Sequence, residues 1–143
     1  MSPIQVDFYL LSDSRPDACL LFACRLLEKA YLQNLTTWVW CQNEIDASEL
    51  DLKLWSFKVE SFIPHARNNE HLPQKPLIEI ATHYPSTCSA TLLLNLSTDV
   101  VLPSPTLLRI LEIVPNIDAA KIISRTHYRA YRAAKYHLNT HEI

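Results

Sequence analysis

The 143-residue sequence contains no glycine, although average usage near 7% would supply about ten. Walker A and GxGxxG loops need glycine because their backbone N–H groups must approach phosphates closely. The absence therefore argues against a nucleotide-binding enzyme of the glycine-loop kind. Turns that require a positive φ are expected at asparagine or aspartate instead, for example at Asn34, Asn43 and Asn116.

Signatures of membrane insertion, secretion and catalysis are also missing from the sequence. No apolar run approaches the roughly 18 residues that a membrane span needs, and the first residues lack the basic segment of a signal peptide. We find no GxSxG, HExxH or paired-carboxylate pattern, and no histidine or cysteine at metal-ligand spacing from His65. The sequence therefore predicts no catalytic residue, no metal site and no cofactor.

The four cysteines, Cys19, Cys24, Cys41 and Cys88, lie in apolar surroundings, and none belongs to a CxxC or CxxH pair. Free, buried thiols are the simplest interpretation in a chain long enough to bury a sizeable core. Free thiols persist in reducing compartments, so we expect the protein in the cytoplasm.

Strand and helix patterns alternate along the chain, which predicts a single α/β domain over residues 1–143 with a largely parallel sheet of about five strands. Strands are expected at Ile4 to Leu11, Thr36 to Cys41, Leu77 to Ala81 and Thr91 to Leu96, and Ile110 to Val114 can form another. Helices are expected at Ala18 to Gln33, from a cap at Asp46 through Phe57, and from Ile117 to the end of the sequence. The residues from Lys58 to Lys75 show no regular pattern.

The segment from Ile117 onward concentrates positive charge. It carries five cations and two acids, whereas the rest of the chain carries eight cations and thirteen acids. On a helix, the cations and two tyrosines share an arc of about 100°. This arc contains Lys121, Arg125, Tyr128, Arg129, Arg132 and Tyr136, and a face of small or apolar residues (Ala119, Ile123, Ala130, Ala134) lies opposite. We therefore expect the small-residue face to be buried and the cation–tyrosine stripe to be exposed.

Three interpretations of the stripe remain open. A charge run on a helix is often only a solvated face. However, no acids are interleaved here for i, i+4 pairing, and the neighbouring tyrosines suit an acidic, partly apolar ligand. A nucleic-acid strand is a further possibility, because bases stack on aromatic side chains.

A second candidate contact surface lies in the middle of the chain, where three large aromatic residues occur close together. Trp55 and Phe57 are expected to lie mostly in the core, whereas Phe62, on the irregular stretch, can be an exposed anchor for a partner protein.

Three segments together resemble one protein family. They are Phe8-Tyr9-Leu10-Leu11, the block from Leu54-Trp55 to Glu60-Ser61-Phe62-Ile63-Pro64-His65, and the tail Tyr128-Arg129-Ala130-Tyr131-Arg132 to Leu138-Asn139. Their order and spacing are similar to the chi (HolC) subunits of bacterial DNA polymerase III holoenzyme. The resemblance spans nearly the whole chain, and the middle block and tail are its most specific parts.

The resemblance implies a Rossmann-like, three-layer fold without a nucleotide-binding loop, in a non-catalytic accessory subunit for DNA replication. It implies two protein partners: the psi subunit, which leads to the clamp loader, and the acidic C-terminal tail of single-stranded-DNA-binding protein. Carried over by position, the tail site comprises Lys121, Arg125, Tyr128, Arg129 and Tyr136. The psi surface, which a helicase can also contact, involves Trp55 and Phe62.

Two departures from the family pattern stand out. The family often has a glycine-containing loop where residues 68–75 of this chain have none, and Arg129 stands where lysine is common. Direct binding of nucleic acid by the basic helix remains the alternative function. A small enzyme of unrecognised type is a third class, for which the sequence offers no candidate residues.

Overall fold

The computed structural model describes residues 4–58, 63–67, 76–85 and 89–143. The strands in these ranges are β1 (Gln5–Leu10), β2 (Thr37–Cys41), β3 (His65–Arg67), β4 (Ile78–Ala81), β5 (Leu92–Leu96), β6 (Arg109–Val114) and β7 (His137–Glu142). The helices are α1 (Ala18–Leu32), α2 (Glu44–Ser56) and α3 (Asp118–Ala133). The strands form one parallel sheet in the order β3-β4-β2-β5-β6-β1-β7.

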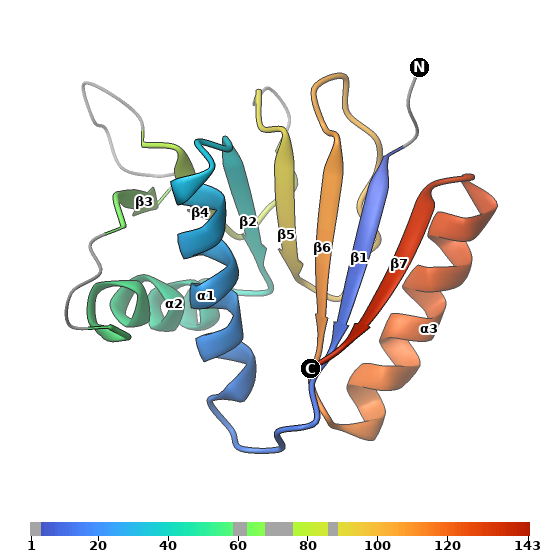
Figure 1. Cartoon of the computed structure of the whole chain (residues 1–143), viewed down its shortest axis with the longest axis horizontal. Helices are drawn as coiled ribbons and strands as arrows, with labels where there is room; N and C mark the ends of the chain where they lie inside the picture. The colour runs from blue at the N-terminus through green and yellow to red at the C-terminus, as the bar shows by residue number, and fades with distance from the viewer. Residues whose placement is uncertain (1–3, 59–62, 68–75, 86–88) are drawn as a thin grey trace.

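Helices cover both faces of the sheet, with α1 and α2 on one side and α3 on the other (Figure 1). Alternate residues of β2 show this arrangement: Val39 packs in the core beneath α1 and α2, whereas Trp38 and Trp40 pack in the core that Tyr131 of α3 joins. A parallel strand buried on both faces has a continuous apolar sequence, as β2 does. The predicted α/β class with a parallel sheet is confirmed, although the described residues contain seven strands where about five were expected.

The sequence did not predict β3 or β7. β3 is a three-residue strand in the stretch expected to be irregular. The prediction that the last helix continues to the end of the chain is wrong: α3 ends at Ala133, and the chain returns as β7, which pairs in parallel with β1. A strand beside β1 gives the backbone of this segment hydrogen-bond partners that a short terminal helix would leave to water.

A glycine-free C-cap reverses the chain at the end of α3. Lys135 adopts a φ of 64°, its N–H donates to the carbonyl of Arg132, and the N–H of Tyr136 donates to the carbonyl of Tyr131. These two bonds define a Schellman motif, which usually places glycine at the left-handed residue. The rings of Tyr136 and Tyr131 stack with centroids 5.7 Å apart and supply the apolar contact of the motif.

Asparagine occupies one of the positive-φ positions at which glycine is usual. Asn34, with a φ of 57°, follows α1 as predicted. The prediction is wrong for Asn43 and Asn116, since Asn34 and Lys135 are the positive-φ residues of the described chain. Asn43 is instead the extended N-cap of α2, and its side chain accepts from the N–H of Asp46 at 2.8 Å. The helix thus begins earlier than expected, with Asp46 in its first turn and not at the cap.

Candidate functional site

The face that α3 buries differs from the one the sequence predicted. The buried side chains of α3 are His127 and Tyr131, whereas Ala119 and Ala134 are exposed, Ala130 is half-buried and Ile123 is 37% exposed. The prediction of a buried small-residue face is therefore wrong. Hydrophobic periodicity did not reveal the buried face of α3, because His127 and Tyr131 carry polar atoms. These atoms find hydrogen-bond partners within the core.

The buried polar atoms of α3 converge on one carboxylate, that of Glu112 in β6. Nδ1 of His127 lies 3.0 Å from Oε1 of Glu112, and the hydroxyl of Tyr131 donates to Oε2 at 2.7 Å. The side-chain amide of Asn95 also donates to Oε2, at 2.8 Å. All four residues are at most 5% exposed. This network anchors α3 to the sheet and sets its rotation about its own axis.

The surroundings of His127 favour its charged form. Its Nε2 lies 2.9 Å from the carbonyl oxygen of Thr98, and its Nδ1 faces the Glu112 carboxylate. A carbonyl oxygen and an ionised carboxylate both accept hydrogen bonds, so this arrangement suits an imidazolium, which donates from both ring nitrogens. Burial acts to lower the pKa of His127, but the hydrogen bond and charge of Glu112 outweigh it, and the net pKa is raised.

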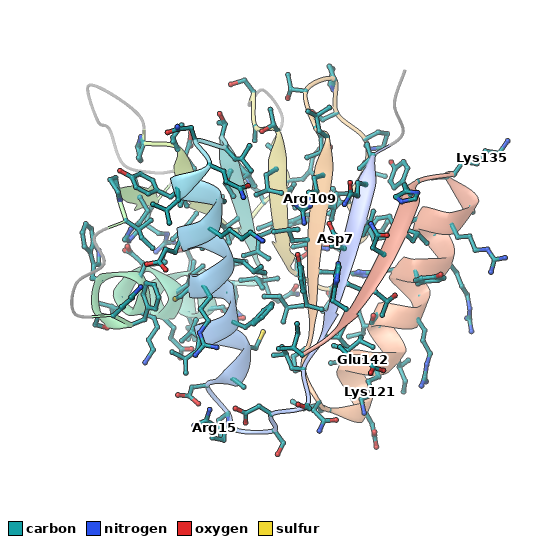
Figure 2. All side chains as sticks on the ribbon, in the orientation of Figure 1. Asp7, Arg15, Arg109, Lys121, Lys135 and Glu142 are labelled. Carbon is teal, nitrogen blue, oxygen red and sulfur yellow. The ribbon has the colours of Figure 1, made fainter. Side chains whose placement is uncertain are left out.

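The rotation of α3 places three residues of the predicted stripe, Lys121, Arg125 and Tyr128, in the lining of an open pocket of about 560 Å³. The pocket lies where β1, β6 and β7 end, against the N-terminal half of α3, and Figure 2 shows Lys121 and Glu142 there. Its lining comprises Phe8, Leu10, Leu11, Ser12, Val114, Asn116, Lys121, Ser124, Arg125, Tyr128, Thr140, Glu142 and Ile143. The carboxyl ends of strands are the usual place for ligands in open α/β sheets. We call this hollow the α3–β7 pocket.

The α3–β7 pocket combines an apolar wall with cations. The ring of Tyr128, 38% exposed, lies 5.5 Å from the buried ring of Phe8, and Leu10 and Val114 also line the wall. Lys121 and Arg125, one helical turn apart, supply ammonium and guanidinium donors. Chemically, the pocket can bind a ligand that joins an apolar or aromatic group to carboxylates or other anions.

The other two residues of the predicted tail site lie outside the pocket lining. Arg129 is exposed on α3, and Tyr136 is half-buried against the core, stacked on Tyr131. The structure thus brings together Lys121, Arg125 and Tyr128. It adds Phe8 from β1 and Glu142 from β7, which the helix pattern could not reveal because they lie on strands and not on the helix.

The second predicted surface is described only in part, because Phe62 lies outside the described residues. Trp55, near the end of α2, is 49% exposed, so the expectation that it lies mostly in the core is wrong. Its ring centroid lies 4.5 Å from that of His65, whose Nε2 is 2.8 Å from Oδ1 of Asp51. Phe57 is half-buried and packs against the core beneath α1 and α2.

The cysteine thiols of the described residues are buried or half-buried and show no sign of a reactive centre. Cys24 and Cys41 are buried and free, and burial raises the pKa of both to about 12, while the half-buried Cys19 has a pKa of about 11. Cys88 lies outside the described residues. Within the described ranges, no group of three or more His, Cys, Asp or Glu side chains could hold a metal ion.

No helix in the described part of the chain is long and apolar enough to cross a membrane.

Comparison with known proteins finds relatives along nearly the whole chain. Residues 4–139 match the family model described as DNA polymerase III chi subunit, HolC. The DNA polymerase III subunit chi of Pseudomonas aeruginosa is 35% identical over 139 residues, which cover 97% of this chain and 96% of the relative. The subunit chi of Escherichia coli is 30% identical, covering 93% and 94%, and that of Haemophilus influenzae 26%, covering 95% of each. The chain therefore belongs to the DNA polymerase III chi subunit family.

Proposed function

We propose that this chain is a non-catalytic accessory subunit of a bacterial DNA polymerase III holoenzyme and works in the cytoplasm. In this role it links the clamp loader, through a psi subunit, to single-stranded-DNA-binding protein. The link to the latter is the α3–β7 pocket, which grips the acidic C-terminal tail. The observation that carries this proposal is the combination of Lys121, Arg125 and Tyr128 in one pocket with an apolar wall.

The chemistry of the pocket matches such a tail. Family resemblance implies a ligand that ends in phenylalanine with a free carboxylate after a run of aspartates. The phenyl ring would enter beside Tyr128 and Phe8, while Lys121 and Arg125 would meet the terminal carboxylate and the aspartates. Arg129, exposed on the same helix, would extend the positive field along the acidic segment.

The expected affinity is micromolar. Burying one phenyl ring contributes about 1.5–3 kcal/mol, and each hydrogen bond to a charged group contributes roughly 1.5–3 kcal/mol. Association costs about 4–15 kcal/mol in lost freedom and ordering. A net free energy on the order of −8 kcal/mol corresponds to a Kd near 1 μM, which should weaken as salt screens the exposed charges.

Calorimetric titration of an acidic, Phe-ended peptide into the protein tests this proposal. Arg125→Ala should weaken binding by about tenfold or more, because one charge-assisted hydrogen bond is worth roughly 1.5–3 kcal/mol. Arg25→Ala is the matched control, since it removes an exposed arginine from α1, on the opposite face of the sheet. Peptide binding that Arg125→Ala leaves unchanged would show that the site assignment is wrong.

The surface around Trp55 is the proposed contact for psi or a helicase, together with Phe62. A half-exposed tryptophan at a helix end is a typical anchor for a protein interface. Trp55→Ala should abolish co-purification of the psi subunit while leaving titration with the tail peptide unchanged. Loss of both interactions together would argue against two separate surfaces.

The runner-up function is direct nucleic-acid binding. The exposure of Arg129 and Arg132 on α3, and of Lys135 just after it, favours this function because these cations extend the positive surface beyond the pocket. Oligonucleotide binding that survives Tyr128→Ala and follows the total positive charge would support this function in place of tail binding.

A further inference from the structure

The α3–β7 pocket contains an acid among its cations. Glu142, at the end of β7, lines the same pocket as Lys121 and Arg125. Figure 2 labels Glu142 and Lys121 at this end of the sheet. A carboxylate is out of place in a site for anions, because it repels the ligand that the cations attract. We propose that Glu142 is a specificity-determining residue that lowers the affinity of this pocket for anionic ligands; this inference rests on the proposed function.

The register of β7 directs Glu142 into the pocket. Glu142 pairs with Leu10 of β1, and Thr140 pairs with Phe8. All four residues line the pocket, so they share the sheet face that α3 covers. His141, between them in sequence, points to the other face, where its Nε2 lies 2.9 Å from Oδ1 of Asp7. Because side chains alternate between the two faces along β7, the Glu142 carboxylate lies on the sheet face that α3 covers.

The charge of Glu142 is not neutralised by a fixed partner. Its side chain is exposed, and the ion pairs formed among the described residues do not include it. It therefore offsets one of the two positive charges that Lys121 and Arg125 bring to the pocket. The charged side chains of the pocket lining therefore sum to +1 and not +2, and a ligand must come close to a carboxylate.

The repulsion grows with the number of charges on the ligand. A short acidic tail can place its ring against the apolar wall and keep part of its charge away from Glu142. A nucleic-acid strand carries one charge at each phosphate and binds largely through those charges. Glu142 thus disfavours a nucleic-acid strand more than an acidic peptide.

Titration of the acidic, Phe-ended peptide into the parent protein and Glu142→Gln tests the inference. At low salt the variant should bind about 2–10-fold more tightly, in the range expected for a partly exposed charge. The gain should shrink as salt is raised, and it should be smaller for a peptide whose aspartates are replaced by asparagine. Glu49→Gln, an exposed acid of α2 on the opposite face, is the matched control and should change the affinity little.

The outcomes separate this inference from the proposed function. If the parent binds the peptide and Glu142→Gln binds it equally or less tightly, the inference is wrong and the proposed function stands. If the peptide does not bind, a single-stranded oligonucleotide replaces it. Tighter oligonucleotide binding by Glu142→Gln would then support the inference and overturn tail binding. A parent that binds neither ligand would overturn both.

Discussion

Nδ1 of His127 lies 3.0 Å from Oε1 of Glu112, and this contact joins α3 to β6, an interior strand of the sheet. His127 precedes Tyr128 in sequence, so the bond that buries the imidazole also directs the next side chain toward the α3–β7 pocket. The orientation of the proposed binding site therefore depends on a buried ion pair in the adjacent core.

Removing the carboxylate of this pair should destabilise the fold. Glu112→Ala leaves a buried imidazolium without its anion and leaves the Tyr131 hydroxyl without its acceptor. Breaking a buried pair in this way costs about 3–5 kcal/mol. Urea unfolding monitored by circular dichroism measures the loss, with the exposed Glu49→Ala expected within about 0.5 kcal/mol of the parent. If Glu112→Ala lowers the free energy of unfolding by less than about 1 kcal/mol, the Glu112 hydrogen-bond network does not stabilise the fold as expected.

The same pair predicts a fall in stability as the solution becomes alkaline. The pKa of His127 is raised in the fold, because the hydrogen bond and charge of Glu112 outweigh burial. A raised pKa contributes stability that is fully present below the unfolded pKa near 6.5 and is lost as pH rises through the folded pKa. Urea midpoints measured from pH 6 upward should fall more for the parent than for His127→Gln. Parallel curves for the two proteins would contradict a charged His127.

The buried Asp7 predicts the opposite trend in acid. Burial acts to raise its pKa, but hydrogen bonds and charges from His141 and Arg109 lower it overall, with Nε of Arg109 2.6 Å from Oδ2 (Figure 2). A lowered pKa gives stability that is present above the unfolded value near 3.9 and lost as pH falls through the folded pKa. Asp7→Asn should therefore show a shallower decline between about pH 5 and pH 2 in thermal unfolding. An unchanged decline would mean that Asp7 does not contribute to acid sensitivity.

Lys135 offers a site for stabilisation. Its φ of 64° brings its Cβ close to the following carbonyl, which costs a lysine roughly 1–2 kcal/mol. Glycine avoids this clash. However, glycine raises the conformational entropy of the unfolded chain, which lowers the free energy of unfolding by about 0.4–1 kcal/mol. Lys135→Gly should therefore raise the free energy of unfolding by about 0.5–1 kcal/mol. Asn34→Gly is the comparison, since asparagine already tolerates φ of 57° there and should gain less.

Much of the fold could be predicted from the sequence because its signals are local. The apolar run of β2 indicated a strand covered on both sides, and the alternation of strands and helices indicated a parallel sheet. Part of the candidate site could be predicted from the sequence for the same reason. Residues 121, 125 and 128 follow helical spacing, so a single helix is enough to bring Lys121, Arg125 and Tyr128 onto one side.

The parts of the fold and of the site that could not be predicted depend on contacts between segments distant in the sequence. Whether the last residues continue a helix or form β7 depends on the hydrogen bonds that β1 offers, and no local pattern reports them. The buried face of α3 follows from the Glu112 carboxylate, which lies on a different element and attracts a histidine and a tyrosine. Phe8 and Glu142 joined the pocket only through strand register. Helical spacing is a property of neighbouring residues, whereas strand pairing and buried charge are properties of the whole fold.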